Sequence, residues 1–403
     1  MITTEPKGAE FDDEAEEQDV AEELGRGTVA AVVSATDWTT ETVVAQLSRG
    51  TIQLNPRFQR RDAWKRDRKS RFIESLIVGL PIPQIVLAES KTDRGKFIVL
   101  DGKQRLLAIL QYWGRGAGPN NGYGLSGLTL RPDLKRKTFK HLSTDPDLED
   151  DYNALVNQSV RTVVIRNWKD TNFLHTVFLR LNTGSVTLSP QELRQALLPG
   201  PFSDFVDEAA ANSPALQRLL GLKGPDPRMR DIEILARFLA FHFFAERYPG
   251  RMKQFLDFAF GEFNTKWSRF QQPVDMATAE FETGVTDLLD IFGDDVARKP
   301  GSSQFNRAIF DALSYFHAYD SIRTALRGKE SKIREEYAAL LDGDTSFVQA
   351  VERDTAGAPN TSARLSIWAE VLGRIAEMPV VPPAIPVAKP NAGRSSVQVD
   401  DQD

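Results

Sequence analysis

The sequence contains no cysteine and only four histidines among its 403 residues. Without cysteine, neither a disulfide framework nor a thiolate metal site can form. The histidines are widely separated, so neither a zinc site nor an HNH nuclease site is expected. They are His141, His175, His242 and His317.

Long apolar runs are also missing. No stretch approaches the ~20 apolar residues that a membrane-spanning helix needs, and the first residues lack the pattern of a secretory signal. We therefore expect a cytoplasmic protein without a membrane partner. A chain of 403 residues is long for one compact unit, which indicates two domains plus tails.

Charge is distributed unevenly along the chain. The net charge is −6, but residues 1–23 carry −9, from one lysine against ten acids, and residues 379–403 carry −1. The remaining body is therefore mildly basic and can bind a polyanion, and the acidic arm could compete for that site. The alternative, which we favour, is an arm that is disordered and solubilising.

The most informative feature is the segment FIVLDGKQR at residues 97–105. It reads as a buried strand, an Asp-Gly turn and the start of a helix that runs from Lys103 to about Trp113. Such a turn directs unpaired backbone N–H groups and the positive end of the helix dipole at one point. Lys103 and Arg105 add cations, and Asp101 is the nearby group that could hold a metal. This chemistry suits phosphate, although strand–turn–helix units are common and usually only connect elements.

A basic segment lies upstream. Between Arg57 and Arg71 there are eight basic and two acidic residues, interleaved with Phe58 and Trp64. A solvated helix face is the ordinary interpretation. However, Pro56 fixes the entry of the loop, and the following helix, about residues 66–78, presents an apolar face that anchors it.

Four ordered motifs together resemble the N-terminal domain family of GmrSD-type modification-dependent restriction endonucleases. They are Gln59-Arg60 with Trp64, RFIESLIVGLPIP at 71–83, VLDGKQRL at 99–106, and FLRLNTGSVTLSPQELR at 178–194. The resemblance implies a ParB/sulfiredoxin-like, nucleotide-binding domain that acts in defence against foreign DNA. Several relatives are nucleoside triphosphatases, and many carry a C-terminal HNH domain.

The resemblance also assigns roles to residues. A nucleoside triphosphate would lie against the turn, with Mg²⁺ held by Asp101 and a water oriented by Gln59 or Gln104. The family signature Asp-Gly-Gln-Gln-Arg falls on residues 101–105, where this chain has Lys103 in place of glutamine. The lysine could tighten phosphate binding or remove an amide that positions the attacking water. The residues expected to bind the nucleotide are Arg57, Arg60, Gly102, Lys103, Arg105 and Asn182.

The fold class expected is α+β, with a small mixed sheet followed by an all-α domain. The first domain should contain helices near 40–47, 66–78 and 103–113, and strands near 51–54, 84–88, 97–100 and 160–165. Ser189-Pro190-Gln191-Glu192 is a capping box that starts a helix. Beyond residue 200 the phenylalanines recur at helical spacing and are assigned to a core, with breaks at prolines that include Pro273. The domains expected are an acidic disordered arm (1–30), a ParB-like nucleotide-binding domain (31–199), a helical domain (200–378) and a proline-rich disordered tail (379–403).

Three functions remain open from the sequence. The first is a nucleotide-binding regulator, with triphosphatase activity if Lys103 permits it, that acts with a separately encoded nuclease or toxin. The second is a non-catalytic DNA-binding or antitoxin-like module in which the basic loop, including Arg60 and Arg61, contacts the DNA backbone. The third is a nuclease that acts through the ParB-like domain itself.

Overall fold

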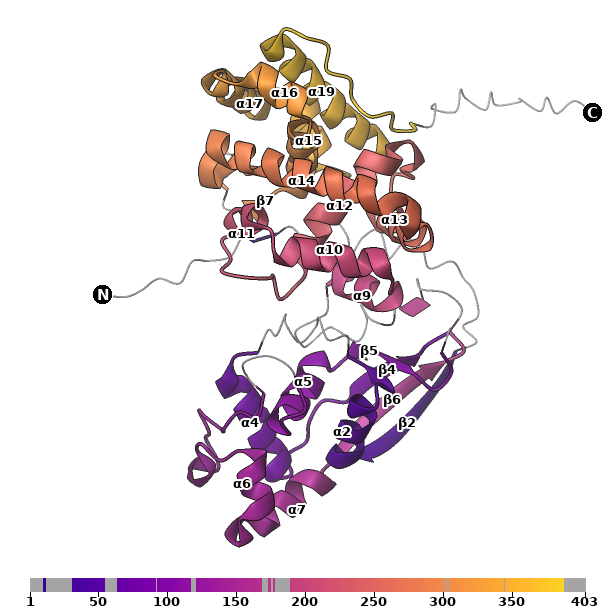
Figure 1. Cartoon of the computed structure of the whole chain (residues 1–403), viewed down its shortest axis with the longest axis vertical. Helices are drawn as coiled ribbons and strands as arrows, with labels where there is room; N and C mark the ends of the chain where they lie inside the picture. Colours follow the sequence, from indigo (N-terminus) through magenta and orange to yellow (C-terminus); the bar gives the residue numbers. More distant parts are fainter. Residues whose placement is uncertain are drawn as a thin grey trace, which may run out of the picture.

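The chain forms a sheet-containing N-terminal region and a helical C-terminal region, which Figure 1 shows one above the other. The computed structural model describes residues 10–11, 31–54, 64–91, 93–116, 121–168, 173–174, 177, 189–299, 301–302, 304–343 and 345–387. Among these residues, no helix is both long enough and apolar enough to cross a bilayer.

The N-terminal region is built on a five-stranded mixed sheet with the order β2-β6-β4-β5-β3. The pairs β2–β6 and β4–β5 are antiparallel, whereas β4–β6 and β3–β5 are parallel. This confirms the expected α+β class with a small mixed sheet. The strands are β2 (Val32–Thr39), β3 (Ile52–Gln53), β4 (Ile85–Glu89), β5 (Phe97–Asp101) and β6 (Ser159–Arg166).

Helices cover both faces of this sheet. On one face, α2 and α5 bury Val43 and Leu106 against Leu87 and Val99. On the other face, Leu193 of α9 packs with Val86 and Leu100. A further layer of α4, α6 and α7 packs outside α5. The helices are α2 (Thr40–Ser48), α4 (Arg66–Ile77), α5 (Lys103–Tyr112), α6 (Phe139–Thr144), α7 (Glu149–Asn157) and α9 (Pro190–Leu197).

The C-terminal region is helical, as the phenylalanine spacing indicated. Phe238, Phe255, Phe281 and Phe310 all lie in its single large core. The helices are α10 (Pro201–Ala211), α11 (Pro214–Leu220), α12 (Arg230–Phe244), α13 (Met252–Thr265), α14 (Trp267–Phe292), α15 (Arg307–His317), α16 (Asp320–Leu326), α17 (Glu330–Gly343), α18 (Thr345–Glu352) and α19 (Ala358–Ala376). Short 3₁₀ turns occur at Pro132–Leu134, Pro146–Leu148, Ala245–Arg247 and Gly293–Asp295.

One predicted break in this region is wrong. Pro273 lies inside α14, a helix that is 26 residues long in total. A proline removes one backbone hydrogen bond from a helix, but Val274, Ala277 and Phe281 are buried just beyond it. This packing holds the helix together across the proline, because helices in proteins are stabilised mainly by their buried face.

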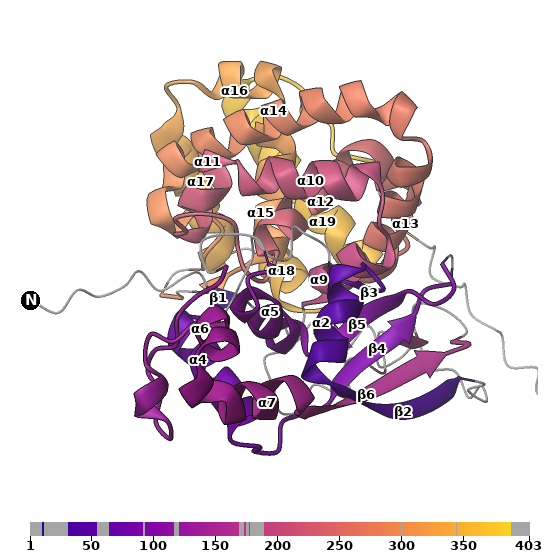
Figure 2. The same cartoon turned by 60° about the horizontal axis from the view of Figure 1, so that its bottom comes forward.

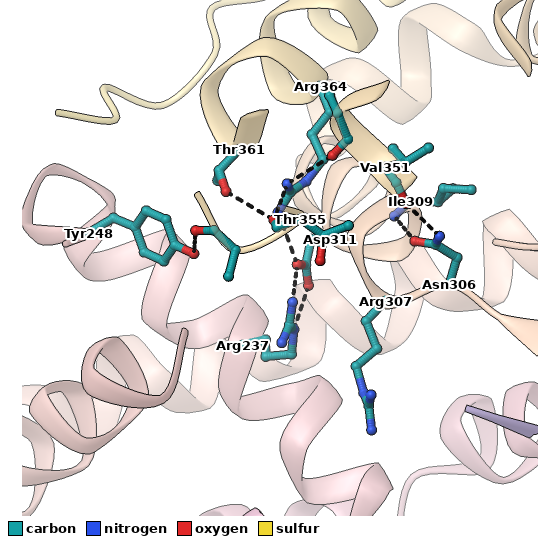
Figure 3. A network of polar contacts seen from close by, with 12 residues as sticks. Arg237, Tyr248, Asn306, Arg307, Ile309, Asp311, Val351, Thr355, Thr361 and Arg364 are labelled. Atoms are coloured by element: carbon teal, nitrogen blue, oxygen red, sulfur yellow. Dashed lines mark hydrogen bonds and ion pairs between the residues drawn. The ribbon is translucent and has the colours of Figure 1, made fainter. Parts of the chain in front are cut away.

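A buried polar network lies in the helical core (Figure 3). Arg237 of α12 donates to both carboxylate oxygens of Asp311 on α15, over 2.9 Å and 2.5 Å. Arg364 of α19 is fully buried and donates to the carbonyl of Thr355 over 2.6 Å. Loss of one partner from such a pair leaves a buried charge uncompensated. The network therefore favours one relative position of α12, α15 and α19.

The structure describes a short part of each expected disordered tail. Two residues of the acidic arm form a strand, β1 (Glu10–Phe11), which pairs in parallel with β7 (Gln304–Phe305) of the helical region. At the other end, residues 379–387 have no helix or strand. Even so, Ile385 is buried in the helical core.

Candidate phosphate-binding turn

The predicted turn is present, and its geometry requires glycine. β5 ends at Asp101, Gly102 adopts a left-handed conformation with φ +97°, and α5 begins at Lys103. A Cβ atom on Gly102 would lie 2.4 Å from Cδ1 of Ile85. The positive φ strains any L-residue with a side chain at this position, and such a residue would also force the Ile85 side chain to shift.

The N-terminus of α5 has no side-chain cap. Its N-cap residue is Gly102, so no side chain is available to accept from the first amides. The first intrahelical bond runs from the amide of Leu106 to the carbonyl of Gly102, over 2.9 Å. The preceding amides have no intrahelical acceptor, and together with the helix dipole they favour an anion. This is the arrangement that the sequence predicted.

Arg105 is already engaged with the carboxylate of the same turn. Its Nη2 atom lies 2.5 Å from Oδ2 of Asp101 and donates to the carbonyl of Gln84 over 3.1 Å. Its Nε is buried and has no hydrogen-bond partner within the described residues. The Asp101 side chain is 18% exposed. A phosphate bound here would compete with Asp101 for the guanidinium.

Lys103 points away from the turn toward α9. Its Nζ donates to Oε1 of Glu192 over 2.7 Å, and both side chains are only 4% exposed. Oε2 of Glu192 accepts from the backbone amide of Ser189 over 2.7 Å, which completes the predicted capping box. A phosphate would therefore have to displace a buried carboxylate to reach this lysine.

Gln104 joins the turn to the upstream basic segment. Its Oε1 accepts from the backbone amide of Trp64 over 3.3 Å. Trp64 is the last residue of the first motif, so that motif ends on the turn. Within the described residues, the amide nitrogen of Gln104 makes no hydrogen bond. Four predicted site residues lie outside the described ranges: Arg57, Gln59, Arg60 and Asn182.

The link that α9 makes between the turn and the helical region was not predicted from the sequence. Besides Glu192, Arg194 of α9 is buried, and its Nε lies 2.7 Å from Oδ1 of Asp257 on α13. Lys253 lies 3.3 Å from the other oxygen of Asp257. The capping box identified the start of α9, but its partners are distant in sequence. No local pattern could have revealed them.

A cavity of about 900 Å³ lies at the opposite end of β5 from the turn. Its walls are formed by β3 and the β4–β5 connection on one side and by the C-terminal ends of α9 and α13 on the other. Its wall includes Ile98, Trp168, Gln195 and Asn264, and none of the predicted site residues. The candidate site is the turn, because the uncapped helix and the two motifs meet there.

The predicted metal site has one candidate ligand, Asp101. The described residues contain no cluster of three or more histidine, cysteine, aspartate or glutamate side chains. Mg²⁺ that accompanies a nucleotide is commonly bound by one or two carboxylates together with phosphate oxygens and water. A single, partly exposed Asp101 fits that arrangement and does not fit an all-protein metal cage.

The comparisons with known proteins agree with the motifs. Residues 42–199 match the family model described as the GmrSD restriction endonuclease, N-terminal domain. No curated protein matches the chain. The matched range begins in α2 and ends just after α9, so it includes the whole strand–turn–helix unit and the helix that contacts it. Residues 42–199, which make up less than half of the chain, are therefore similar to the GmrSD restriction endonuclease N-terminal domain family.

Proposed function

We propose that this protein is the nucleotide-binding regulator of a restriction system that defends against foreign DNA. In this proposal it binds and hydrolyses a nucleoside triphosphate at the Asp101–Arg105 turn and controls a separately encoded nuclease or toxin. The family match supports the restriction context. The nucleotide, its hydrolysis and the separate effector are our inference.

The contact between Trp64 and Gln104 is the observation that carries the proposal. It brings the end of a strongly basic segment onto an uncapped helix N-terminus, although the two residues are 40 positions apart. Phosphate groups are bound by this combination of backbone amides, helix dipole and flexible cations. Arg57 and Arg60 precede Trp64 closely in sequence and are the cations expected to supplement Arg105.

An exchange of partners would couple phosphate binding to the metal. Arg105 is paired with Asp101 over 2.5 Å. A phosphate that takes the guanidinium leaves the carboxylate of Asp101 open to a cation. Bound Mg²⁺ would supply charge neutralisation for the phosphate oxygens. In that arrangement Gln104, held by the amide of Trp64, or Gln59 would orient the attacking water.

Helix α9 offers a route by which occupancy could reach the helical region. It contacts the turn through Glu192 and Lys103, and it contacts α13 through Arg194 and Asp257. Figure 2 shows α9 between the sheet and the helical region. In the proposal, a shift of the turn on nucleotide binding is passed through these two ion pairs to the effector-binding part of the molecule.

Phosphate release from a panel of nucleoside triphosphates with Mg²⁺ tests the proposal. The full-length protein should release phosphate, and Arg105→Ala and Asp101→Asn should each lower the rate by about tenfold or more, which corresponds to about 1.4 kcal/mol. Arg115→Ala is the matched control, because this exposed arginine lies beyond the other end of α5.

Nucleotide binding is measured separately as a shift in melting temperature, since a ligand stabilises the folded state that binds it. If no nucleotide gives either phosphate release or a shift in melting temperature, the proposal is overturned. A melting shift without release would leave a nucleotide-binding regulator and remove the hydrolysis.

A further inference from the structure

The basic cluster near residue 135 lies on the same surface as the basic start of α4. Figure 1 shows α4 and α6 below the helical region, and both helices pack against α7. The surface carries seven exposed cations from two segments that are far apart in sequence. They are Lys65, Arg66, Arg68 and Arg71 from the first segment, and Lys135, Arg136 and Lys140 from the second.

Several hydrogen bonds hold residues 124–131, which precede the second segment, on α4. Arg66 donates to the carbonyl of Gly124 through Nε and Nη2, over 2.9 Å and 2.6 Å. Ser70 accepts from the amide of Ser126 over 3.0 Å. Glu74 accepts from three successive backbone amides, those of residues 129, 130 and 131. Burial acts to raise the pKa of Glu74, but these amide hydrogen bonds outweigh it and lower the pKa, so the carboxylate stays charged.

Backbone pairing places Arg136 next to this anchored segment. Leu125 accepts from the amide of Arg136 over 2.8 Å and donates to the carbonyl of Lys137 over 3.0 Å. A Cβ atom on Gly124 would lie 2.6 Å from the carbonyl oxygen of Arg136. The two basic segments are therefore held next to each other by backbone hydrogen bonds. Their proximity does not depend on the conformations of the lysine and arginine side chains.

Three acidic groups in this area are engaged with neighbours, whereas Asp147, Glu149 and Asp150, at or just before the start of α7, are exposed. Asp67 accepts from the hydroxyl of Ser126, Asp133 pairs with Arg131, and Asp145 pairs with Lys137. Across the described part of the chain, Lys135, Arg136 and Lys140 make no ion pair. Their charges are therefore available to an external polyanion.

The aromatic groups nearby are packed and do not form a stacking platform. The Arg68 guanidinium covers the ring of Trp64, 4.6 Å from its centroid. Phe139 stacks on Trp113 with centroids 4.4 Å apart. Single-stranded nucleic acid is usually held by bases stacked on exposed aromatics. A rigid, aromatic-poor field of lysine and arginine fits the regularly spaced phosphates of a duplex better.

We propose that the surface formed by α4 and residues 135–140 is a docking surface for the phosphate backbone of duplex DNA. It uses residues that take no part in the proposed nucleotide site. The surface would retain DNA without reading its sequence, because phosphate contacts position a protein and do not specify bases.

Anisotropy of a labelled duplex of about 30 base pairs, titrated with full-length protein between about 50 and 200 mM salt, tests this inference. The variant Lys135→Glu/Arg136→Glu/Lys140→Glu should weaken binding by about tenfold or more. Its plot of log affinity against log salt should be shallower by about 0.9 for each phosphate that the variant no longer neutralises. Arg136 has φ +67°, and glutamate is no more strained there than arginine.

The matched control is Arg269→Glu/Arg327→Glu/Lys332→Glu, which makes the same charge change at exposed positions of the helical region. It should bind DNA like the wild type. An equal loss of DNA affinity in both variants would show an effect of net charge and would overturn the proposal. The proposal would also be overturned if the wild-type protein does not bind the duplex. Tighter, surface-dependent binding of a single-stranded RNA would overturn the duplex assignment.

Two readouts separate misfolding and failure of the nucleotide site from this result. The glutamine variant Lys135→Gln/Arg136→Gln/Lys140→Gln removes charge without reversing it, and it should show a smaller loss in the same direction. Phosphate release should be unchanged in both surface variants. If the glutamate variant binds DNA as tightly as the wild type and its melting temperature is unchanged, the DNA-docking surface is refuted. The proposed nucleotide site is not affected by that result.

Discussion

The cations nearest the predicted phosphate site are held by carboxylates of the protein itself. Arg105 is paired with Asp101, and Lys103 is paired with Glu192. In the first pair Arg105 is buried but the Asp101 carboxylate is 18% exposed, so a ligand can reach the pair from that side. The second is buried, so its disruption carries the cost of an uncompensated charge. At the residue scale, Arg105 is therefore the better candidate for a phosphate ligand, and Lys103 is better suited to holding α9.

A second feature at this scale is the buried imidazole of His317, at the end of α15. Its Nδ1 lies 3.1 Å from the carbonyl of Leu313, which accepts the ring N–H. Burial lowers the pKa of His317 to about 4. Asp287 lies 3.9 Å from Nε2 and would by itself favour a charged ring. We consider the ring neutral, because it is fully buried and burial also raises the pKa of Asp287.

His317 should make stability depend on pH. The histidine pKa is about 6.5 in the unfolded chain and about 4 in the folded protein. The unfolded chain thus binds more protons between these values, and stability is lost as the pH falls through this window. Relative to His317→Gln, the wild type should lose about 3 kcal/mol between neutral pH and about pH 4. Urea unfolding at several pH values measures this, with exposed His141→Gln as the control. Parallel curves for wild type and His317→Gln would contradict it.

At the scale of elements, α5 and α9 are joined by the Lys103–Glu192 pair. Lys103→Gln restores the family signature, but it leaves the buried Glu192 with Arg228, whose Nε lies 4.0 Å from Oε2, in place of its ammonium. We expect this variant to be destabilised by up to about 3 to 5 kcal/mol. Lys103→Gln/Glu192→Gln should recover most of that loss, because two amides can hydrogen-bond to each other. Urea unfolding of both single variants and the double variant measures the coupling.

The control for this prediction is an exposed pair at the same distance. Lys299 and Glu352 also lie 2.7 Å apart, but their side chains are 35% and 40% exposed. Lys299→Gln should cost less than about 1 kcal/mol. Equal costs at the buried and the exposed pair would show that the Lys103–Glu192 pair does not hold the two helices together.

Elements with a local signal were predictable from the sequence. The runs of β4 and β5, the periodic face of α4 and the capping box of α9 all appear close to the expected positions. β2 was not predicted, because its eight residues include Ser34, Thr36 and Asp37 and its exposure pattern does not alternate. It is a strand because it pairs with β6 along its whole length.

The candidate site was predictable in its backbone and not in its side-chain partners. Asp-Gly before a basic helix start identified the turn. The pairing of Lys103 with Glu192 depends on residues 89 positions apart, and no local pattern encodes such a contact. For the same reason the two halves of the basic surface were recognised as separate clusters, although the loop between them brings them together.

At the scale of the whole molecule, the C-terminal segment closes part of the helical core. Ile385 is 9% exposed, whereas Val381 is 79% exposed. Truncation after residue 387 should therefore leave the melting temperature unchanged. Truncation after residue 378 should lower stability by at least about 1.5 to 3 kcal/mol, because it removes the buried Ile385 and also Val380, which packs against the same core.

Chemical unfolding of the two truncated proteins measures this difference. Ile385→Ala in the full-length chain should reproduce much of the longer truncation, and Val381→Ser should have no effect. If both truncated proteins unfold like the full-length chain, residues 379–387 contribute nothing to the fold.

The strand pair β1–β7 also sets an order in time. Glu10 and Phe11 pair with Gln304 and Phe305, so β1 has a partner that is synthesised only after most of the helical region. The sheet of the N-terminal region needs no residue that late, and it can form while translation continues. β1 would therefore join β7 after the N-terminal sheet has formed, as one of the last pairings in the fold.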